Sequence, residues 1–282
     1  MRFEFIKITE ERDAELALYF SMNEAQLLHY YEPELGLFVV ESPVVIERAL
    51  AAGYEVKSFV MIDSLAEEMC DKFNTIVRDN NNYQDNNDPI PVYVADYGTI
   101  AGMTGVNITR GVLALMKRRK LPTLEQLVKD YRRIAVFDDV ENPTNVGAMF
   151  RSAAALGIDA VVLAGASSDP LYRRASRVSV GTVFQLPWTK LSKKDKSIDY
   201  IETLHQLGFK TVAMALNDNS IQIDDERLKS EEKLAIILGN EGVGLSDDVI
   251  AKSDYVAKIP MKNNVDSLNV AAASSIIFWE LR

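Results

Sequence analysis

A regular alternation of apolar strands and helices over the carboxyl-terminal half constrains this chain more than any other feature. The pattern predicts strands over 134–137, 160–163, 211–216, 234–238 and 255–259, and helices over 145–156, 200–207 and 267–281. Strands that alternate with helices form a parallel sheet, which the helices cover on both faces. The carboxyl-terminal half is therefore predicted to be an α/β domain.

Three segments that follow predicted strands carry an unusual set of polar and glycine residues. The first runs from Asn142 to Arg151, the second from Leu238 to Leu245, and the third from Ile259 to Ala273. In open parallel sheets, ligands bind in the loops at the carboxyl ends of the strands. We therefore expect these segments to form a binding site together.

Each segment taken alone also has a structural explanation. The helix after the first segment offers free amides, and Arg151 a permanent charge, to a phosphate. Alternatively, Asn145 caps this helix and Arg151 pairs with a surface acid. The glycines of the second segment allow either close ligand approach or a tight turn, and they do not match a dinucleotide-binding or Walker pattern. In the third, Asp266 or Ser267 is expected to cap a helix.

The amino-terminal half reads as a smaller α/β unit. Its pattern predicts a helix over 13–31, a strand over 36–40, a helix from Ser42-Pro43 to Gly53, a strand over 56–62 and an exposed loop over 79–89. This interpretation divides the chain into an amino-terminal domain over 1–115, a basic linker over 116–133 and a second domain over 134–282.

The net charge of −10 argues at first against a nucleic-acid partner, because phosphate binding needs clustered Lys and Arg. The distribution is uneven, however. Residues 1–109 hold 7 basic and 19 acidic residues, whereas residues 110–133 hold 8 and 2. The basic stretch 117–120 belongs either to a solvated linker helix or to an RNA-facing one, and the sequence favours neither.

Metal and disulfide chemistry lack the residues they need. The chain has one cysteine, Cys70, and two distant histidines, His29 and His205. These are too few for an intrachain disulfide, a zinc site or a histidine-based triad. No apolar run reaches the roughly 18 residues that span a bilayer, and residues 1–10 alternate in polarity. We expect a cytoplasmic protein without a metal or a membrane partner.

Taken in this order, the three segments resemble the motifs of the SpoU/TrmH family of the SPOUT superfamily, the RNA ribose 2′-O-methyltransferases. The resemblance covers about residues 134–282, and Asp169-Pro170-Leu171, Arg177-Val178-Ser179 and Gly181 also match. More weakly, residues 20–115 resemble the ribosomal-protein-like domain that many members use for RNA recognition. Two features depart from the family: Asn142-Pro143 replaces a common Asp-Pro, and the first domain is acidic.

The resemblance implies a trefoil-knotted α/β domain, a homodimer, and methyl transfer from S-adenosylmethionine to a ribose 2′-hydroxyl of structured RNA, with rRNA favoured over tRNA. It assigns cofactor binding to Gly239, Ile259, Met261 and Leu268, and catalysis to Arg151, Asn145, Glu241, Ser267 and Asn269. Arg151 either takes the proton of the hydroxyl or stabilises the developing negative charge.

Two other functions are compatible with an α/β chain. One is a non-catalytic protein of the same fold that binds RNA or S-adenosylmethionine. The complete set of polar motif residues argues against it, because a structural remnant has little physical need for them. The other is a nucleotide-dependent enzyme unrelated to methylation, which would need phosphate-loop and ribose-binding patterns that this sequence does not show.

Overall fold

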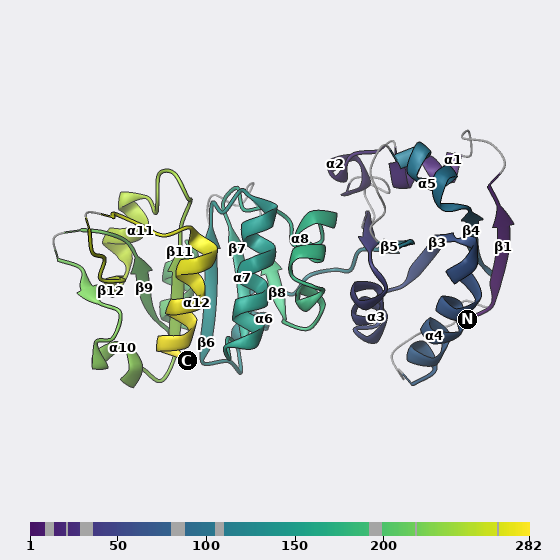
Figure 1. The fold of residues 1–282 in the computed structure, drawn as a ribbon. Helices are drawn as coiled ribbons and strands as arrows, with labels where there is room; N and C mark the ends of the chain where they lie inside the picture. Colours follow the sequence, from purple (N-terminus) through teal and green to yellow (C-terminus); the bar gives the residue numbers. More distant parts are fainter. Residues whose placement is uncertain are drawn as a thin grey trace. The chain divides into compact units, whose positions relative to one another are not determined.

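The computed structural model describes residues 1–8, 14–20, 22–28, 36–79, 88–104, 110–191, 199–217, 219–263 and 265–282. The chain divides into two compact units. Unit 1 comprises residues 1–120 together with 171–184, and unit 2 comprises residues 121–170 and 185–282. Figure 1 shows the elements of both units. Each unit is described by itself below.

Unit 1 is built on a five-stranded mixed sheet. Its strands follow the order β1-β4-β3-β5-β2, with β1 (Phe3–Lys7), β2 (Leu37–Glu41), β3 (Val56–Ile62), β4 (Ile90–Ala95) and β5 (Val112–Lys117). Its helices are α1 (Ala14–Phe20), α2 (Glu24–Leu28), α3 (Pro43–Ala51), α4 (Asp63–Asp79), α5 (Tyr97–Thr104), α8 (Arg173–Val178) and the 3-10 helix η1 (Thr182–Phe184). The strands β1, β4 and β3 are parallel, whereas β5 is antiparallel to both β3 and β2.

The first helix with strong sequence signals forms as expected. Pro43 occupies the first turn of α3, where its missing amide hydrogen costs nothing. The chain turns out of the helix at Gly53, whose φ of 79° is unfavourable for other residues. The helix predicted over 13–31 is instead two short helices, α1 and α2. Residues 80–87, most of the expected exposed loop, lie outside the described residues.

A segment between two strands of unit 2 belongs to unit 1. The chain leaves unit 2 after Pro170, contributes α8 and η1 to unit 1, and returns at Gln185. Unit 1 also extends through Lys120, because β5 runs to Lys117 and the next residues pack beside it. This division by contacts differs from the sequence-based division, which follows chain order and therefore gives no insertion.

Unit 2 contains the parallel sheet expected from the sequence. Its strands follow the order β10-β12-β9-β11-β6-β7-β8, and every neighbouring pair is parallel. They are β6 (Arg133–Asp138), β7 (Ala160–Ala164), β8 (Trp188–Lys190), β9 (Lys210–Met214), β10 (Ile221–Gln222), β11 (Leu234–Leu238) and β12 (Tyr255–Lys258). The central strands β7 and β11 are buried at every position, as helices on both faces require.

Six helices accompany this sheet within the described part of unit 2. They are α6 (Leu124–Val128), α7 (Pro143–Ala155), α9 (Tyr200–Gln206), α10 (Glu226–Ser230), α11 (Asp247–Lys252) and α12 (Val270–Leu281). Helices α7 and α12 lie side by side (Figure 1), and Ser152 hydrogen-bonds Ser275 between them at 2.8 Å. Across the described ranges, every helix is too short or too polar to span a bilayer.

Two expectations about helix ends are wrong. Neither Asp266 nor Ser267 caps the last helix: α12 begins at Val270, and Asn269 is its cap, accepting a hydrogen bond from the Ala271 amide at 3.0 Å. The basic stretch 117–120 is not helical, because Lys117 ends β5 and α6 starts only at Leu124. At the last helix the sequence offers several polar residues as caps, and Asn269 is the one that also contacts Asn145.

Candidate active site

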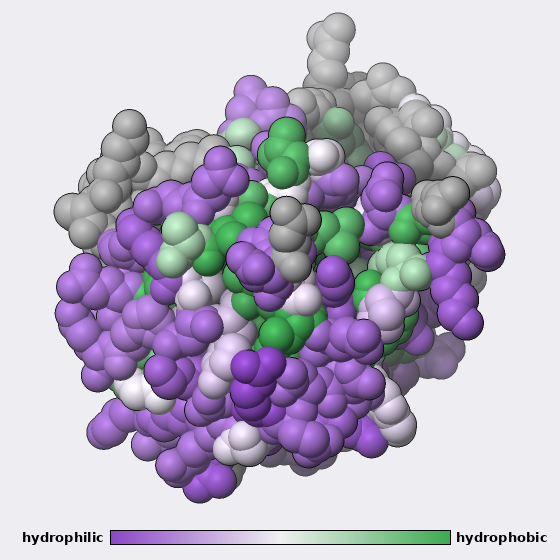
Figure 2. All heavy atoms as spheres, turned by 90° about the vertical axis from the view of Figure 1, so that its left-hand side faces the viewer, coloured by the Kyte–Doolittle hydropathy of each residue, from purple (hydrophilic) through white to green (hydrophobic). Residues whose placement is uncertain are grey.

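A cavity of about 480 Å³ lies at the carboxyl ends of three neighbouring strands of unit 2, β9, β11 and β12. This volume is in the usual range for a small-molecule site. The cavity is lined by the second and third motif segments, the end of β9 and the first turns of α12. Figure 2 shows hydrophobic side chains gathered within a largely hydrophilic face of this unit.

The cavity gathers six of the nine predicted site residues. Those that line it are Gly239, Glu241, Ile259, Met261, Ser267 and Leu268. Asn145, Arg151 and Asn269 are not in its wall. The second and third segments are therefore brought together as expected, although their strands, β11 and β12, are separated in the sheet by β9.

The second segment is a tight turn that only glycine can begin. A Cβ atom on Gly239 would lie 2.7 Å from the Leu245 nitrogen and 2.8 Å from the Gly244 carbonyl carbon. Both are backbone atoms, so a side chain there would force the turn to open. Gly244 closes the turn at a φ of 72°. The backbone of this segment can therefore approach a ligand closely.

Asn240 holds this turn in place, although the sequence analysis gave it no role. Its Oδ1 accepts hydrogen bonds from the amides of Gly242 at 2.8 Å and Val243 at 3.1 Å. Its Nδ2 donates to the Asp139 carbonyl at 3.0 Å, which joins the turn to the loop after β6. Asparagine side chains often bond the backbone two residues onward, and this habit is the signal that could have identified Asn240.

A chain of three polar side chains links the three motif segments. The Asn145 Nδ2 donates a hydrogen bond to Glu241 Oε1, and the Asn269 Nδ2 donates to Asn145 Oδ1 at 3.3 Å. Asn145 is buried at 8% exposure. It lies inside α7, which Asn142 caps by accepting from the Thr144 amide. Asn145 is therefore not the helix cap, and the two ends of its amide join Glu241 and Asn269.

Arg151 has a different environment from this chain of amides. It lies six residues after Asn145 on α7, about 9 Å further along the helix axis, and it is exposed. Within the described residues, no hydrogen bond or ion pair involves its side chain. In the described part of unit 2, Arg151 therefore does not pair with a surface acid, which was the alternative considered from the sequence. Its full charge is available to a group from outside.

The acid that ends β6 is a structural group. The Tyr200 hydroxyl donates to Asp138 Oδ2 at 2.7 Å. Burial raises the pKa of Asp138, partly offset by this hydrogen bond, and the neighbouring Asp139 raises it further. The pKa of Tyr200 is also raised, first by burial and then by Asp138. This pair fastens the start of α9 to the sheet beside the site.

The end of β9 contributes a wall that the sequence analysis missed. Met214, Ala215 and Leu216 line the cavity, and Leu216 is 56% exposed. The signal was available in the sequence, because the strand predicted over 211–216 belongs to the same parallel sheet and its carboxyl end must share an edge with those of the other strands. In the described part of the chain, no three His, Cys, Asp or Glu side chains converge into a metal-binding group.

Comparison with known proteins matches both the fold and the motifs. The model of the SpoU rRNA Methylase family matches residues 132–279. An uncharacterized tRNA/rRNA methyltransferase of Mycobacterium tuberculosis is 32% identical over 246 residues, which cover 87% of this chain and 80% of the relative. That alignment extends beyond the family model, so it includes part of the amino-terminal half.

Solved structures with this fold cover both units. An rRNA methyltransferase from Sinorhizobium meliloti, solved with AdoMet bound, superposes with a TM-score of 0.78 at 22% identity and covers 99% of this chain and 97% of its own. A structure described as an RNA 2′-O ribose methyltransferase gives 0.71 at 22% identity, covering 98% of both chains. The match to the family model spans more than half of the sequence, and the chain therefore belongs to the SpoU rRNA Methylase family.

Proposed function

We propose that this protein transfers a methyl group from S-adenosylmethionine to a ribose 2′-hydroxyl of structured RNA, with rRNA as the favoured substrate. The observation that carries the proposal is the hydrogen-bonded chain that runs from Asn269 through Asn145 to Glu241, which lines the cavity. It ties all three motif segments to one place. The family and the AdoMet-bound relative support the choice of reaction and cofactor.

The cavity suits S-adenosylmethionine in its surface chemistry. Met214, Ile259 and Leu268 offer apolar contacts for an adenine ring, and the turn at Gly239 offers backbone groups without a side chain in the way. Glu241 and Asp266 place carboxylates in the wall, which favours a ligand with a positive sulfonium and ammonium group. The residues present therefore fit this cofactor, with Gly239, Ile259, Met261 and Leu268 holding it.

When bound, the cofactor supplies a methyl group that its sulfonium already activates, so alignment and removal of one proton are the protein's tasks. Asn145 orients Glu241 and Asn269 by using both ends of its amide. Because Asn269 also caps α12, the first turn of that helix is fixed relative to α7. Ser267, which lies in the cavity wall just before this cap, can then hydrogen-bond the ribose.

Arg151 acts on the reacting oxygen in this proposal. A guanidinium keeps its proton at neutral pH, so Arg151 stabilises the negative charge that develops on the 2′-oxygen, and the hydroxyl proton passes to solvent water as the oxygen–methyl bond forms. An arginine already engaged by a carboxylate would be neutralised, but Arg151 has no such partner among the described residues. The RNA therefore supplies both contacts of Arg151: the reacting 2′-oxygen and a phosphate beside that ribose.

A homodimer is part of the proposal. Helix α12 exposes Ile276 at 42% and Trp279 at 56%, and exposed apolar groups of this size indicate a surface that another molecule covers. Light scattering at micromolar concentration tests this: the proposal expects twice the chain mass, and Trp279→Glu should yield the monomer. The trefoil knot and the cytoplasmic location inferred from the sequence remain predictions.

The function is tested by incubating purified protein with S-adenosylmethionine carrying a labelled methyl group and total RNA from cells that lack the gene. Nuclease digestion and mass spectrometry then identify the modified nucleoside. The proposal expects label in 2′-O-methylated nucleosides from rRNA. Label on a base or in tRNA would overturn the corresponding part. Binding of S-adenosylmethionine without any transfer to RNA would support the non-catalytic alternative.

A further inference from the structure

The positive charge of unit 1 is concentrated in two stretches that are far apart in sequence. Residues 117–120 contain four cations and no acid, and residues 171–184 contain three arginines and no acid. The rest of the unit is strongly acidic, since residues 1–109 hold 7 basic and 19 acidic residues. The question is whether the two stretches meet in the folded unit.

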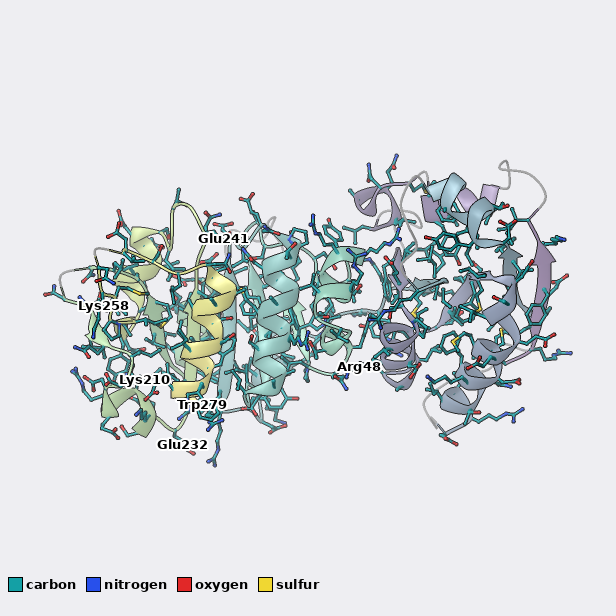
Figure 3. The ribbon with its side chains drawn as sticks, in the orientation of Figure 1. Arg48, Lys210, Glu232, Glu241, Lys258 and Trp279 are labelled. Atoms are coloured by element: carbon teal, nitrogen blue, oxygen red, sulfur yellow. The ribbon has the colours of Figure 1, made fainter. Side chains whose placement is uncertain are left out.

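Helix α8 brings the second stretch against strand β2. Arg173 Nε and Arg177 Nη1 lie 2.9 and 3.3 Å from the same oxygen of Glu41, which is only 1% exposed. Just after α8, the Val180 carbonyl accepts a hydrogen bond from Arg48 Nη1 at 2.7 Å, and Figure 3 labels this arginine on α3. Two guanidinium groups thus share one carboxylate, so this contact has a net positive charge.

Aromatic rings hold the first stretch at the same edge of the sheet. The Phe38 ring stacks on Phe184 at 6.0 Å, and the Tyr54 ring packs against Phe184 at 5.2 Å. The guanidinium of Arg118 lies 5.9 Å from the centre of the Phe38 ring, and that of Arg119 lies 4.4 Å from the Tyr54 ring. Such contacts fix a guanidinium in place without neutralising it.

A small cavity confirms that the two stretches are neighbours. Arg118, Leu171 and Tyr172 line it together with residues of β2. Strand β2 is at one edge of the five-stranded sheet, and β1 is at the other. The cations of both stretches therefore gather around the β2 edge of unit 1.

Four cations at this edge have no carboxylate partner among the described residues, and we name them the β2-edge cations: Arg48, Arg119, Lys120 and Arg174. Arg48 and Arg119 are held by the carbonyl oxygens of Val180 and Ala52, which carry no net charge. Lys120 and Arg174 are exposed and make no hydrogen bond or ion pair within the described ranges. By contrast, nearby Lys117 pairs with Glu55 at 2.6 Å.

We propose that the β2-edge cations bind the phosphodiester backbone of the RNA substrate. This inference rests on the proposed function and locates the RNA contact of unit 1, whose overall charge would otherwise repel RNA. Clustered Lys and Arg without acidic partners favour phosphate, and the Arg119 guanidinium, held over the Tyr54 ring, keeps its donors in a fixed geometry. One of the four cations, Arg174, comes from α8 and not from the amino-terminal residues of unit 1.

The test uses the full-length double variant Lys120→Ala/Arg174→Ala. Neither side chain makes a hydrogen bond or ion pair within the described ranges, so the variant should fold as the wild type does. The matched control is Lys7→Ala/Arg78→Ala, which removes two exposed cations from β1 and from the end of α4. Binding of a short fluorescein-labelled RNA duplex, and of a single strand of equal length, is measured by anisotropy over a range of salt concentrations.

The proposal expects weaker RNA binding by the β2-edge variant and a salt slope reduced by about two, since each lost phosphate contact removes close to one. The control should bind as the wild type does, and S-adenosylmethionine affinity should be equal in all three proteins. Equal RNA affinity and slope for the β2-edge variant and the wild type would overturn the inference. If the wild type methylates RNA in the same preparations, that failure would leave the proposed function intact.

Discussion

The two edges of the parallel sheet in unit 2 use charged and polar residues in opposite ways. At the carboxyl edge lie a cavity, a glycine turn and the hydrogen-bonded chain from Asn269 through Asn145 to Glu241. At the amino edge, Arg133 donates to the carbonyls of Leu281, Glu232 and Lys229. In Figure 3, Glu241 lies at the first edge, and Lys210 and Glu232 lie toward the other.

The difference shows where this chain has groups that a ligand can still contact. Paired groups at the amino edge stabilise the fold, whereas the lining of the cavity and the side chain of Arg151 on α7, which has no partner among the described residues, are open to a ligand. Changes in the cavity lining or at Arg151 should therefore alter catalysis with little effect on stability. Changes at the amino edge should do the reverse. Four substitutions test this contrast, beginning with the largest expected effect.

Arg151→Ala should lower kcat at least a hundredfold, which matches the loss of one charge-stabilising group in other active sites. Because the side chain has no partner among the described residues, the melting temperature and the affinity for S-adenosylmethionine should stay at wild-type values. Steady-state methyl transfer, calorimetric titration and thermal melting measure these three quantities. Arg151→Lys, which keeps the charge, should recover part of the rate. Wild-type turnover by Arg151→Ala would break the comparison.

Arg133→Ala should lower the free energy of unfolding by about 2 kcal/mol, because it leaves several carbonyl groups without their donor. Its kcat per folded molecule should be unchanged. The neighbouring Arg132 is the control: its side chain is 71% exposed and lies 3.8 Å from Glu232, so Arg132→Ala should change stability by less than about 0.5 kcal/mol. Urea denaturation distinguishes the two variants, and equal stabilities would contradict the assignment of the amino edge.

Gly239→Ala should weaken S-adenosylmethionine binding about tenfold, or roughly 1.4 kcal/mol, because the added methyl group meets the backbone of Gly244 and Leu245. Gly242→Ala in the same turn is the matched control. A Cβ there would lie 3.4 Å from Asn240 Oδ1, an ordinary contact. Calorimetric titration should therefore find the affinity of this control close to that of the wild type. Equal affinity for both variants would mean that the turn does not shape the cofactor site.

Asp254→Asn should have the smallest effect, about 1 kcal/mol of stability at neutral pH. Burial opposes ionisation of Asp254, but hydrogen bonds from Lys210 and Thr211 outweigh it and hold its pKa below the usual value. A lowered pKa stabilises the fold above the unfolded pKa of about 3.9, and the contribution is lost as the pH falls through the folded pKa.

The difference between the wild type and Asp254→Asn should therefore shrink when denaturation is repeated below about pH 4. Asp248→Asn serves as the control, because its carboxylate is 72% exposed in its pair with Lys252. A stability difference that does not depend on pH would show that Asp254 acts through packing and not through its charge.

Much of unit 2 could be predicted because its signals are local. Apolar runs gave β6, β7, β11 and β12 to within a residue or two, and the family resemblance is confirmed by the family model. Asn269 was missed as the cap of α12, since Asp266 and Ser267 are equally good caps by composition. Only the contact with Asn145 distinguishes among them.

Unit 1 was harder to predict because its organisation depends on contacts between distant parts of the chain. Strand β1 pairs with β4, more than eighty residues away, and nothing local in Phe3–Lys7 indicates this. The insertion of α8 depends on Glu41 meeting Arg173 and Arg177. These residues lie far apart in the sequence, so charge counts along the chain did not predict the basic edge that they help to form in the folded unit.

The central claim is that the carboxyl edge of unit 2 methylates a ribose hydroxyl and that Arg151 is part of that chemistry. Mass spectrometry of RNA from cells lacking the gene, after incubation with the wild type, Arg151→Ala or Arg133→Ala, tests it most directly. The account predicts one 2′-O-methylated nucleoside with the wild type and, per folded molecule, with Arg133→Ala, and almost none with Arg151→Ala. An equal yield from Arg151→Ala, or methylation of a base, would contradict it.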